Sequence, residues 1–495
     1  MPTRLSRASA PEPRPAIVET RDESNASTPD EAGPPARVVQ RDGVPEAGPD
    51  APARPRVSAK PLGGRPQFLS RFLRSLVPRP DLTKGTGSRP AALVVSLCRA
   101  LLSQRGEASG RQLATEVLAA YRQLDDEARG AFFDLLVDEF SPAPNVVSSA
   151  ADAYKADPSQ ANLLALERAV EPRRQELFRR LNMAHDGTAA LVSLRTELLR
   201  TVGAHPKRRA VDADLVHLFK SWFNRGFLTL QRIDWRTSAV ILERLIQYEA
   251  VHQIQGWADL RRRLEADRRC YAFFHHALPD EPLIFIEVAL TRGMTGQVQP
   301  LLDIASPVVD PARADSAIFY SITNCQEGLR GVSFGNLLIK QVVEDLGQSF
   351  RRIRQFATLS PIPGFRAWLH SSGSLQNADP IVRTFVSNAI DSGSIGTTPV
   401  PADVSQALSR LCARYLVHAK DGKAPLDPVA RFHLANGARL ERLNWAGDIS
   451  ETGVRRSLGF TVNYVYRLAD VERNHEAYAN DCQVIASRWF QRMAS

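Results

Sequence analysis

The spacing of apolar residues changes once along this 495-residue chain, and that change constrains the fold more than any other feature. From Phe68 to about residue 203 the apolar residues recur every three or four positions, which places them on one face of each helix. After residues 203–210, a basic segment that we interpret as a hinge, β-branched and aromatic runs replace this spacing. The pattern therefore predicts an all-helical domain followed by a domain built on a sheet.

Residues 1–66 differ from both of these regions, because they hold 13 of the 33 prolines and no aromatic residue. Such a segment buries too little apolar surface to offset the entropy lost on ordering, so we predict a disordered tail. The helical domain then spans residues 67–204. It contains no catalytic motif. We expect this domain to pack against the same domain of another copy and so to build a homo-oligomer.

Residues 205–495 alternate strand-like runs with helical ones, the pattern of a layered domain with a mixed sheet. We therefore assign the chain to the α+β class. The strands are expected at residues 282–290, 316–322, 355–359 and 458–466, and the clearest helices at residues 336–346 and 404–416.

Composition and short signals exclude several classes of protein. The longest apolar run, residues 91–102, is interrupted by Arg99 and is too short for a membrane span. The formal charge of +9 comes without a nucleic-acid-binding signature, so no nucleic-acid partner is expected. Five scattered cysteines without a Cys-x-x-Cys pair favour reduced thiols. Since the first residues lack a convincing transit helix and the last three are not a peroxisomal signal, we expect a cytoplasmic location.

The stretch from Ser316 to Phe365 is the most informative one for chemistry. A predicted strand leads into a loop with Arg330, Gly331 and Gly335, and an amphipathic helix follows. Glycines let backbone amides approach a phosphate, and the first turn of a helix offers free N–H groups to it. An ordinary tight turn would use the same glycines, so the residues alone leave both interpretations open.

The wider sequence resembles a known family. The spacing from Arg330 to Gly335 is similar to the pyrophosphate loop of GNAT-type acyltransferases, although Ser333 stands where the first glycine is expected. Seven motifs in order resemble malonyl-CoA decarboxylases, strongly over residues 205–490. They are residues 270–276, 281–283, 317–321, 328–331, 359–365, 428–437 and 444–445.

The resemblance implies a helical domain that builds oligomers, a GNAT-like catalytic domain, and specific site residues. It identifies Ser360, within the motif at 359–365, as proton acceptor and His433, within the motif at 428–437, as proton donor. Both are expected to contact the malonyl group. The loop expected to bind coenzyme A consists of Arg330, Gly331, Val332, Ser333, Phe334, Gly335 and Asn336.

The implied reaction explains why such residues are needed. Loss of carbon dioxide from malonyl-CoA leaves a thioester enolate, whose charge must be stabilised and whose carbon must be protonated. The thioester is itself the electron sink, so we expect no metal or other cofactor, with malonyl-CoA and acetyl-CoA bound only as substrate and product. Histidine suits the role of proton donor. Serine alone is a poor base, so we expect Ser360 to hydrogen-bond the carboxylate or to relay a proton with His433.

Other polar residues have a structural interpretation beside the functional one. Ser321, Asn324, Asn463 and Tyr464 lie near strand ends and could line the pocket, with a core or turn role equally open. For His275 and His276 we favour packing over metal binding, because adjacent strand residues point to opposite faces. We interpret the basic runs 207–209 and 261–263 as solvated faces, with contact to the 3′-phosphate of coenzyme A as the lesser alternative.

Two other functions remain open from the sequence. A GNAT-type transferase that moves an acyl group from coenzyme A to an amine would use the same loop, and it would depend on an acceptor. A non-enzymatic helical scaffold that binds coenzyme A would show no turnover of malonyl-CoA at all.

Overall fold

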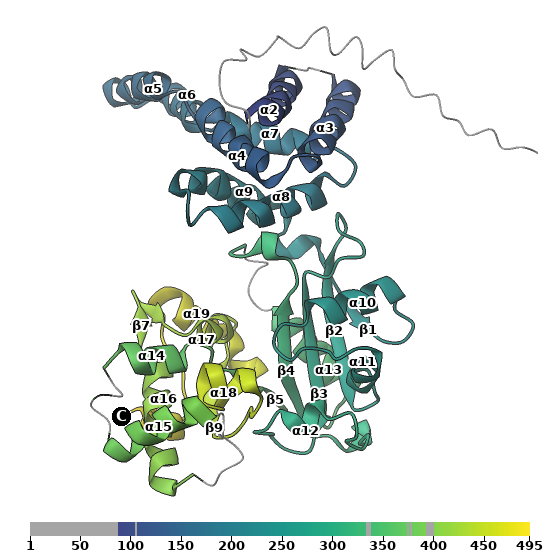
Figure 1. Cartoon of the computed structure of the whole chain (residues 1–495), viewed down its shortest axis with the longest axis vertical. Coiled ribbons are helices and arrows are strands. Elements are labelled where there is room, and N and C mark those ends of the chain that lie inside the picture. The colour runs from purple at the N-terminus through teal and green to yellow at the C-terminus, as the bar shows by residue number, and fades with distance from the viewer. Residues whose placement is uncertain (1–87, 104–105, 333–337, 374–375, 377–378, 393–399) are drawn as a thin grey trace, which may run out of the picture. The chain divides into compact units, whose positions relative to one another are not determined.

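The structure is a computed structural model that describes residues 88–103, 106–332, 338–373, 376, 379–392 and 400–495. The predicted tail at 1–66 and the helix expected from Phe68 lie outside the described residues. The described chain begins with helices and continues into a mixed sheet (Figure 1), so the predicted α+β class is confirmed. No helix in these ranges is long and apolar enough to cross a membrane.

The N-terminal helices pack through the apolar stripes that the spacing predicts. Phe132 and Phe133 are 1% exposed and lie against the ring of Tyr121. Polar residues start several of these helices, as when the Asp125 carboxylate accepts a hydrogen bond from the N–H of Ala128. The helices are α2 (Ser88–Ser103), α3 (Glu107–Arg122), α4 (Asp126–Phe140), α5 (Pro144–Ala156), α6 (Gln160–Val170), α7 (Arg173–Leu181), α8 (Gly187–Thr201), η1 (Pro206–Arg208) and α9 (Arg209–Trp222).

Helical packing continues beyond residue 204. Helix α9 packs against α4, α7 and α8, and Arg208 of η1 donates hydrogen bonds to the Asp134 carboxylate. The expected hinge at residues 203–210 is therefore built into the helical packing. The sheet begins after α9 and η2 (Arg225–Phe227).

The main sheet has the order β1-β2-β3-β4-β5-β10-β6, with β9 paired to β10. Strands β1 to β4 form an antiparallel meander, whereas β4 and β5 are parallel. The strands are β1 (Leu228–Ile233), β2 (Arg268–His275), β3 (Ile284–Thr291), β4 (Ser316–Asn324), β5 (Gln355–Thr358), β6 (Ser360–Pro361), β9 (Arg439–Asn444) and β10 (Thr461–Tyr466), and a small separate sheet pairs β7 (Lys420–Asp421) with β8 (Ala424–Pro425).

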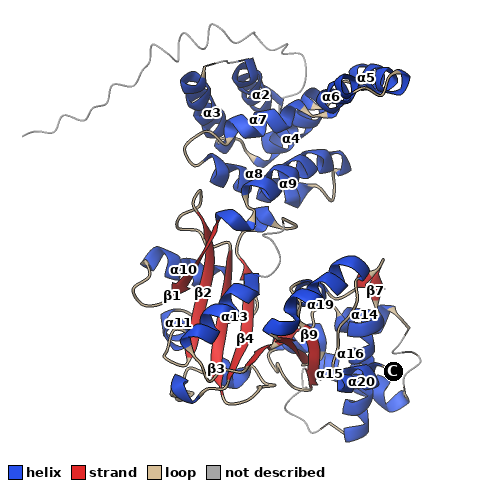
Figure 2. Ribbon diagram, turned by 180° about the vertical axis from the view of Figure 1, so that it is seen from behind, coloured by secondary structure: helices blue, strands red, loops and turns tan. Residues whose placement is uncertain are grey.

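Both faces of the meander are covered at its inner strands, so β2, β3 and β4 are buried along most of their length. On β2, Cys270 and Ala272 face the core beneath α10 (Ala239–Tyr248) and α11 (Trp257–Arg263). Tyr271 and Phe273, which alternate with these residues along β2, belong to the core that includes α13 (Leu338–Ser349). Helix α13 connects β4 to β5 along the chain (Figure 2). This alternation follows from the two-residue period of a strand.

Of the remaining helices, α12 and η3 lie in the segment that joins β3 to β4, and η4 follows β4. The others gather around the C-terminal strands, where α17 lies near the end of β10. The remaining helices are α12 (Gln299–Leu302), η3 (Pro311–Arg313), η4 (Glu327–Leu329), α14 (Phe365–Ser371), α15 (Pro380–Ser392), α16 (Ala402–His418), α17 (Pro428–Ala435), α18 (Glu451–Ser457), α19 (Leu468–Asp481) and α20 (Arg488–Ala494).

Candidate active site

Ser360 and His433, the two residues predicted to carry the chemistry, lie within hydrogen-bonding distance of each other. Ser360 begins β6 just after β5 ends, and it pairs with Val462 of β10. His433 lies on the short helix α17. The Asp427 carboxylate starts this helix by accepting hydrogen bonds from the first-turn backbone N–H groups at 3.0 and 2.9 Å. The fold therefore joins two residues that are 73 positions apart.

A chain of four side chains connects the two residues to the sheet. The distance from Ser360 Oγ to His433 Nε2 is 2.9 Å, and Ser360 Oγ donates to Thr358 Oγ1 at 2.8 Å. His433 Nδ1 lies 2.8 Å from the hydroxyl of Tyr466. Because the single proton of Ser360 goes to Thr358, His433 must donate through Nε2–H and accept from Tyr466 at Nδ1.

The surroundings of His433 keep it uncharged. Its side chain is 3% exposed, and its ring stacks on the ring of Tyr464 with 4.5 Å between centroids. Burial lowers the pKa of His433 to about 3, because removing the imidazolium from water disfavours the charged form. At neutral pH the imidazole is therefore neutral, with one N–H that points to Ser360.

A cavity of about 210 Å³ opens beside these two residues, and we call it the acyl pocket. None of its described lining residues bears a formal charge, given the neutral state of His433. The lining residues are Val251, Phe319, Tyr320, Ser321, Ile322, Asn324, Leu359, Ser360, Pro361, Pro428, Val429, Phe432 and His433. The pocket therefore suits a small acyl group, and its uncharged walls favour a reaction in which that group gives up a negative charge.

A second, larger cavity of about 480 Å³ adjoins the first, and we call it the long cleft. Ile322, Asn324 and Phe432 line both cavities, so the two lie side by side. The other lining residues of the long cleft include Leu283, Ile284, Cys325, Gln326, Arg330, Gly331, Val332 and Ile339. This combination suits an elongated ligand whose small reactive end reaches Ser360 and His433.

The loop predicted to bind phosphate lies along the long cleft. Arg330 extends into solvent, with its side chain 66% exposed and 3.8 Å from the Glu327 carboxylate. Gly331 has a φ of 78°, a conformation that glycine adopts without strain, and Val332 is buried. Ser333, Phe334, Gly335 and Asn336, also predicted for this loop, lie outside the described residues.

The four polar residues considered for the pocket occupy two different environments. Ser321 and Asn324 do line the acyl pocket. Tyr464 instead lies behind the imidazole of His433, and Asn463 donates a hydrogen bond to the backbone oxygen of Thr358 at 2.6 Å. These last two residues therefore support the chain of four side chains from the sheet.

The basic runs are solvated faces only in part, because Lys207, Arg209 and Arg261 are exposed but the other three arginines are buried. Arg262 and Arg263 are 5% and 2% exposed, and both form ion pairs with buried carboxylates. Arg208 is likewise buried. Charge alone could not reveal this, because the nearby carboxylates of Asp259 and Asp267 give no sign in the sequence of being buried, and Glu287 and Asp134 lie on other segments of the chain.

The two histidines at the end of β2 pack against neighbouring groups, but their side chains do not point to opposite faces as expected. His275 Nε2 lies 3.0 Å from the backbone oxygen of Trp222, and its ring contacts that of Phe223. The rings of His275 and His276 are only 4.3 Å apart, since the strand ends at His275 and strand alternation ends with it.

Sequence reasoning missed several residues of the site. Tyr466 could have been found, because it follows Tyr464 by two positions on the same strand and so shares its face. Thr358 precedes Ser360 by the same spacing. Val251 lies in a loop with no regular pattern, and nothing in the sequence indicates that it reaches the acyl pocket.

Known protein families match most of the described chain. The model of the malonyl-CoA decarboxylase N-terminal domain matches residues 140–223, and that of the malonyl-CoA decarboxylase C-terminal domain matches residues 226–494. The second match alone covers more than half of the chain. The chain belongs to the malonyl-CoA decarboxylase family. The junction between the two matches follows α9, where the sheet begins.

Individual relatives agree with this assignment. Mitochondrial malonyl-CoA decarboxylase of Anser anser anser is 37% identical over 343 residues, covering 64% of this chain and 68% of the relative. The crystal structure of malonyl-CoA decarboxylase from Rhodopseudomonas palustris is 48% identical, with a TM-score of 0.76, covering 81% of this chain and 99% of that one. The one from Agrobacterium vitis is 47% identical, with the same TM-score and coverage.

The family gives the activity, and the predicted family and function are both confirmed. The protein is a carboxy-lyase that converts malonyl-CoA to acetyl-CoA and carbon dioxide.

Proposed function

We propose that Ser360 and His433 perform this decarboxylation together in the acyl pocket. The observation that carries the proposal is their buried hydrogen bond of 2.9 Å at the wall of the acyl pocket, which adjoins the long cleft. Malonyl-CoA is an elongated thioester with a carboxylate at its end. With its pantetheine arm in the long cleft, the malonyl group would enter the acyl pocket.

The neutral pocket favours the loss of the carboxylate. In water the malonyl carboxylate is stabilised by solvation. The described lining residues of the acyl pocket include no cation that would stabilise it in place of water. When the bond between carbon 2 and the carboxyl carbon breaks, carbon dioxide leaves without charge and the electron pair passes into the thioester as an enolate. The negative charge then lies on the thioester oxygen and on carbon 2, within reach of hydrogen-bond donors.

His433 is the proton donor in this proposal. Its neutral imidazole presents Nε2–H at the pocket wall. A neutral histidine can still donate a hydrogen bond or a proton to the reacting group in a site that is too buried for an imidazolium. Protonation at carbon 2 gives acetyl-CoA, and a proton from solvent restores the imidazole. One proton is consumed for each carbon dioxide released.

Ser360 acts as a relay and an orienting group, not as a base. Its own proton is directed to Thr358, so its oxygen accepts from His433. A base would need the opposite arrangement, with the hydroxyl proton given to the imidazole. The thioester oxygen or the departing carboxylate can take the hydrogen bond from His433 when Ser360 releases it.

Coenzyme A binding is assigned to the long cleft and the loop that begins at Arg330. The exposed guanidinium of Arg330 can meet a phosphate with little loss of solvation, since its ion pair with Glu327 is a loose one of 3.8 Å. Gly331 leaves its backbone open to a ligand, as no neighbouring atom lies within 4 Å of the position a Cβ would take. Ser333 to Asn336 complete this loop in the proposal.

The chemistry requires no metal or organic cofactor, because the thioester accepts the electron pair. Within the described ranges no group of three His, Cys, Asp or Glu residues could hold a metal ion. We propose that catalysis uses protein side chains alone.

The experiment that tests this function measures acetyl-CoA formation from malonyl-CoA by purified protein, with chelator present and no amine. Turnover is expected. Replacing His433→Asn should lower kcat at least about 100-fold, the usual contribution of a general acid, while binding of coenzyme A persists. His276→Asn, an exposed histidine at the end of β2, is the matched control and should keep full activity. Full activity in the His433 variant would exclude the role, and dependence on an amine would indicate an acyltransferase.

We also propose that the helical region forms a homo-oligomer through the α5–α6 hairpin. These two helices pack against each other and bury no residue within the chain, while Val146, Leu164 and Val170 remain between 42 and 50% exposed. A second copy of the hairpin would cover these side chains. The paired substitution Val146→Glu and Leu164→Glu should lower the molar mass measured by light scattering, and an unchanged mass would contradict the proposal.

A cytoplasmic location remains part of the proposal. The buried thiols of Cys98, Cys270, Cys325 and Cys412 form no disulfide in the described chain, as expected in a reducing compartment. Cell fractionation followed by detection of the protein would test it.

A further inference from the structure

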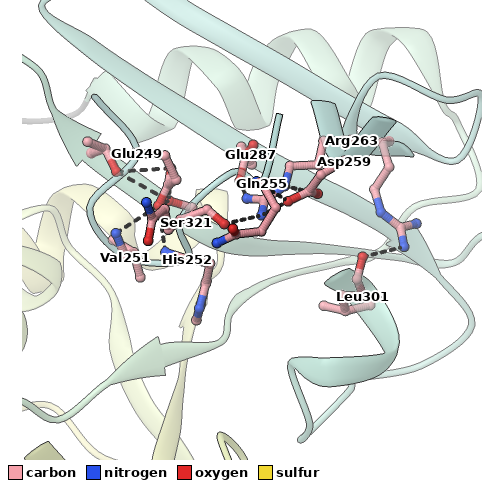
Figure 3. Close-up of polar contacts among 12 residues, drawn as sticks. Glu249, Val251, His252, Gln255, Asp259, Arg263, Glu287, Leu301 and Ser321 are labelled. Carbon is pink, nitrogen blue, oxygen red and sulfur yellow. Dashed lines mark hydrogen bonds and ion pairs between the residues drawn. The ribbon is translucent and has the colours of Figure 1, made fainter. Parts of the chain in front are cut away.

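The loop between α10 and α11 contributes a wall of the acyl pocket. Most lining residues come from β4, from the segment around β6 and from α17, but Val251 comes from this loop. The Ser360–His433 chemistry does not involve the loop. The loop is nonetheless held in place by an extensive set of buried polar contacts (Figure 3).

Glu249 fixes the first end of the loop. Its side chain is buried, and one carboxylate oxygen accepts hydrogen bonds from the backbone N–H groups of Val251 and His252, each at 2.8 Å. The carboxylate also accepts from Ser321 Oγ at 2.8 Å and from Thr323 Oγ1 at 3.2 Å. Because Ser321 lines the acyl pocket, Glu249 ties two of the pocket's walls together.

A buried ion cluster fixes the other end. The N–H of Gln255 donates to the Asp259 carboxylate at 2.9 Å, and Arg263 pairs with that carboxylate at 2.8 Å. Arg263 also donates to the backbone oxygen of Gln253 and to Glu287 of β3, at 3.4 and 3.0 Å. The loop is therefore held at both ends, and the wall it forms cannot retreat without breaking hydrogen bonds to buried charged groups.

We propose that Val251 determines which acyl groups the enzyme accepts, and that Glu249 is the positioning residue that holds it there. A fixed β-branched side chain leaves the small pocket room for an unsubstituted malonyl group and excludes malonyl groups that bear an alkyl branch at carbon 2. The proposal rests on the proposed function, since it takes the cavity beside Ser360 and His433 as the acyl pocket.

The test compares malonyl-CoA with 2-ethylmalonyl-CoA, which would lose carbon dioxide to give butyryl-CoA. The measured quantity is kcat/KM for the branched substrate divided by that for malonyl-CoA. In Val251→Ala this ratio should rise about tenfold, and in Val251→Ile it should fall by a similar factor, as expected for one or two carbon atoms in an apolar pocket. A ratio within twofold of wild type in either variant overturns the proposal.

Ile254→Val is the matched control for a loop change that does not reach the pocket. Ile254 is 3% exposed and packs in the core beneath α10 and α11, away from the lining residues. This variant should lose some stability but keep the wild-type ratio. A changed ratio here would mean that any loss of packing beneath the loop alters selectivity, whatever the size and position of Val251, which also overturns the proposal.

Glu249→Gln tests the positioning role. An amide cannot accept all four hydrogen bonds, because its NH2 group would face donors, so Val251 should be held less firmly. The selectivity ratio should rise about threefold, and Glu249→Asp should lie between this variant and wild type. A purely structural role would lower activity on both substrates equally and leave the ratio unchanged. Loss of activity in His433→Asn tests the proposed function separately from these ratios.

Discussion

At the scale of single residues, the protonation state of His433 is the decisive property of the site. Burial alone lowers its pKa, and Tyr466 and Ser360 occupy both ring nitrogens. The site thus holds an acid that is neutral throughout the physiological range. This differs from the simplest expectation for a histidine donor, in which the imidazolium is the acid.

The lowered pKa predicts how activity and stability depend on pH. The folded pKa is about 3, whereas an unfolded histidine titrates near 6.5. Activity should therefore show no change from His433 titration between pH 6 and 8. Below pH 6.5 the unfolded chain binds a proton that the folded chain does not bind. This lowers the free energy of unfolding by up to about 1.4 kcal/mol for each pH unit down to pH 3.

Denaturant unfolding of wild type and His433→Asn at pH 5 and pH 7 checks this prediction. The asparagine variant should lose less stability on acidification than wild type does. Equal losses in the two proteins would contradict a neutral buried histidine.

At the scale of elements, α17 places the histidine, and its start is controlled by one residue. Asp427 is fully buried, accepts two backbone hydrogen bonds at the first turn, and contacts the hydroxyl of Tyr415 at 3.2 Å. The helix spans only eight residues, Pro428–Ala435, so a change at its start reaches His433 within two turns.

Asp427→Ala should lower the free energy of unfolding by about 1–2 kcal/mol, the usual effect of a lost N-cap, and should also reduce kcat. Asp125→Ala is the control, because Asp125 caps α4 in the same way, far along the chain from the site. It should cost similar stability and leave kcat unchanged. Equal kcat values in the two variants would show that α17 does not depend on its cap to position His433.

At the scale of the whole molecule, the helical region contacts the segment that leads into the loop proposed to bind coenzyme A. Arg195 of α8 donates a hydrogen bond to the backbone oxygen of Gly328 at 2.7 Å. A Cβ at Gly328 would lie 2.0 Å from the backbone oxygen of Val192, so only glycine fits between α8 and η4. The helices therefore help to set the position of Arg330, two residues later.

Gly328→Ala should raise KM for malonyl-CoA about tenfold while kcat changes less, because the substitution displaces the binding loop and not the Ser360–His433 pair. Gly347→Ala is the control, since a Cβ there meets its nearest neighbour at an ordinary 3.8 Å. Steady-state kinetics of both variants check this. An unchanged KM in the Gly328 variant would mean that the helical region does not influence substrate binding.

Much of the architecture followed from the sequence because it depends on local patterns. Apolar spacing of three and four residues predicted α3 and α4, helix-forming residues predicted α6 and α8, and β-branched runs predicted β3, β4 and β5. The family motifs identified Ser360 and His433, and the two lie together as the resemblance implied. The edge strand β1 was not predicted, because half of its positions are polar and solvent-facing.

Only the tertiary structure decided the features that depend on distant partners. Burial and the absence of nearby charge set the pKa of His433, and neither is visible in the motif around it. The sequence predicted that the arginines at 262 and 263 are solvated. In the structure they are buried and form ion pairs with Asp267, Asp259 and Glu287. The sequence by itself determined the class of fold, and its motifs identified the Ser360–His433 pair that we propose as reactive. The folded chain determined the protonation state of that pair and the wall of its pocket, because electrostatics and packing act between residues that are close in space.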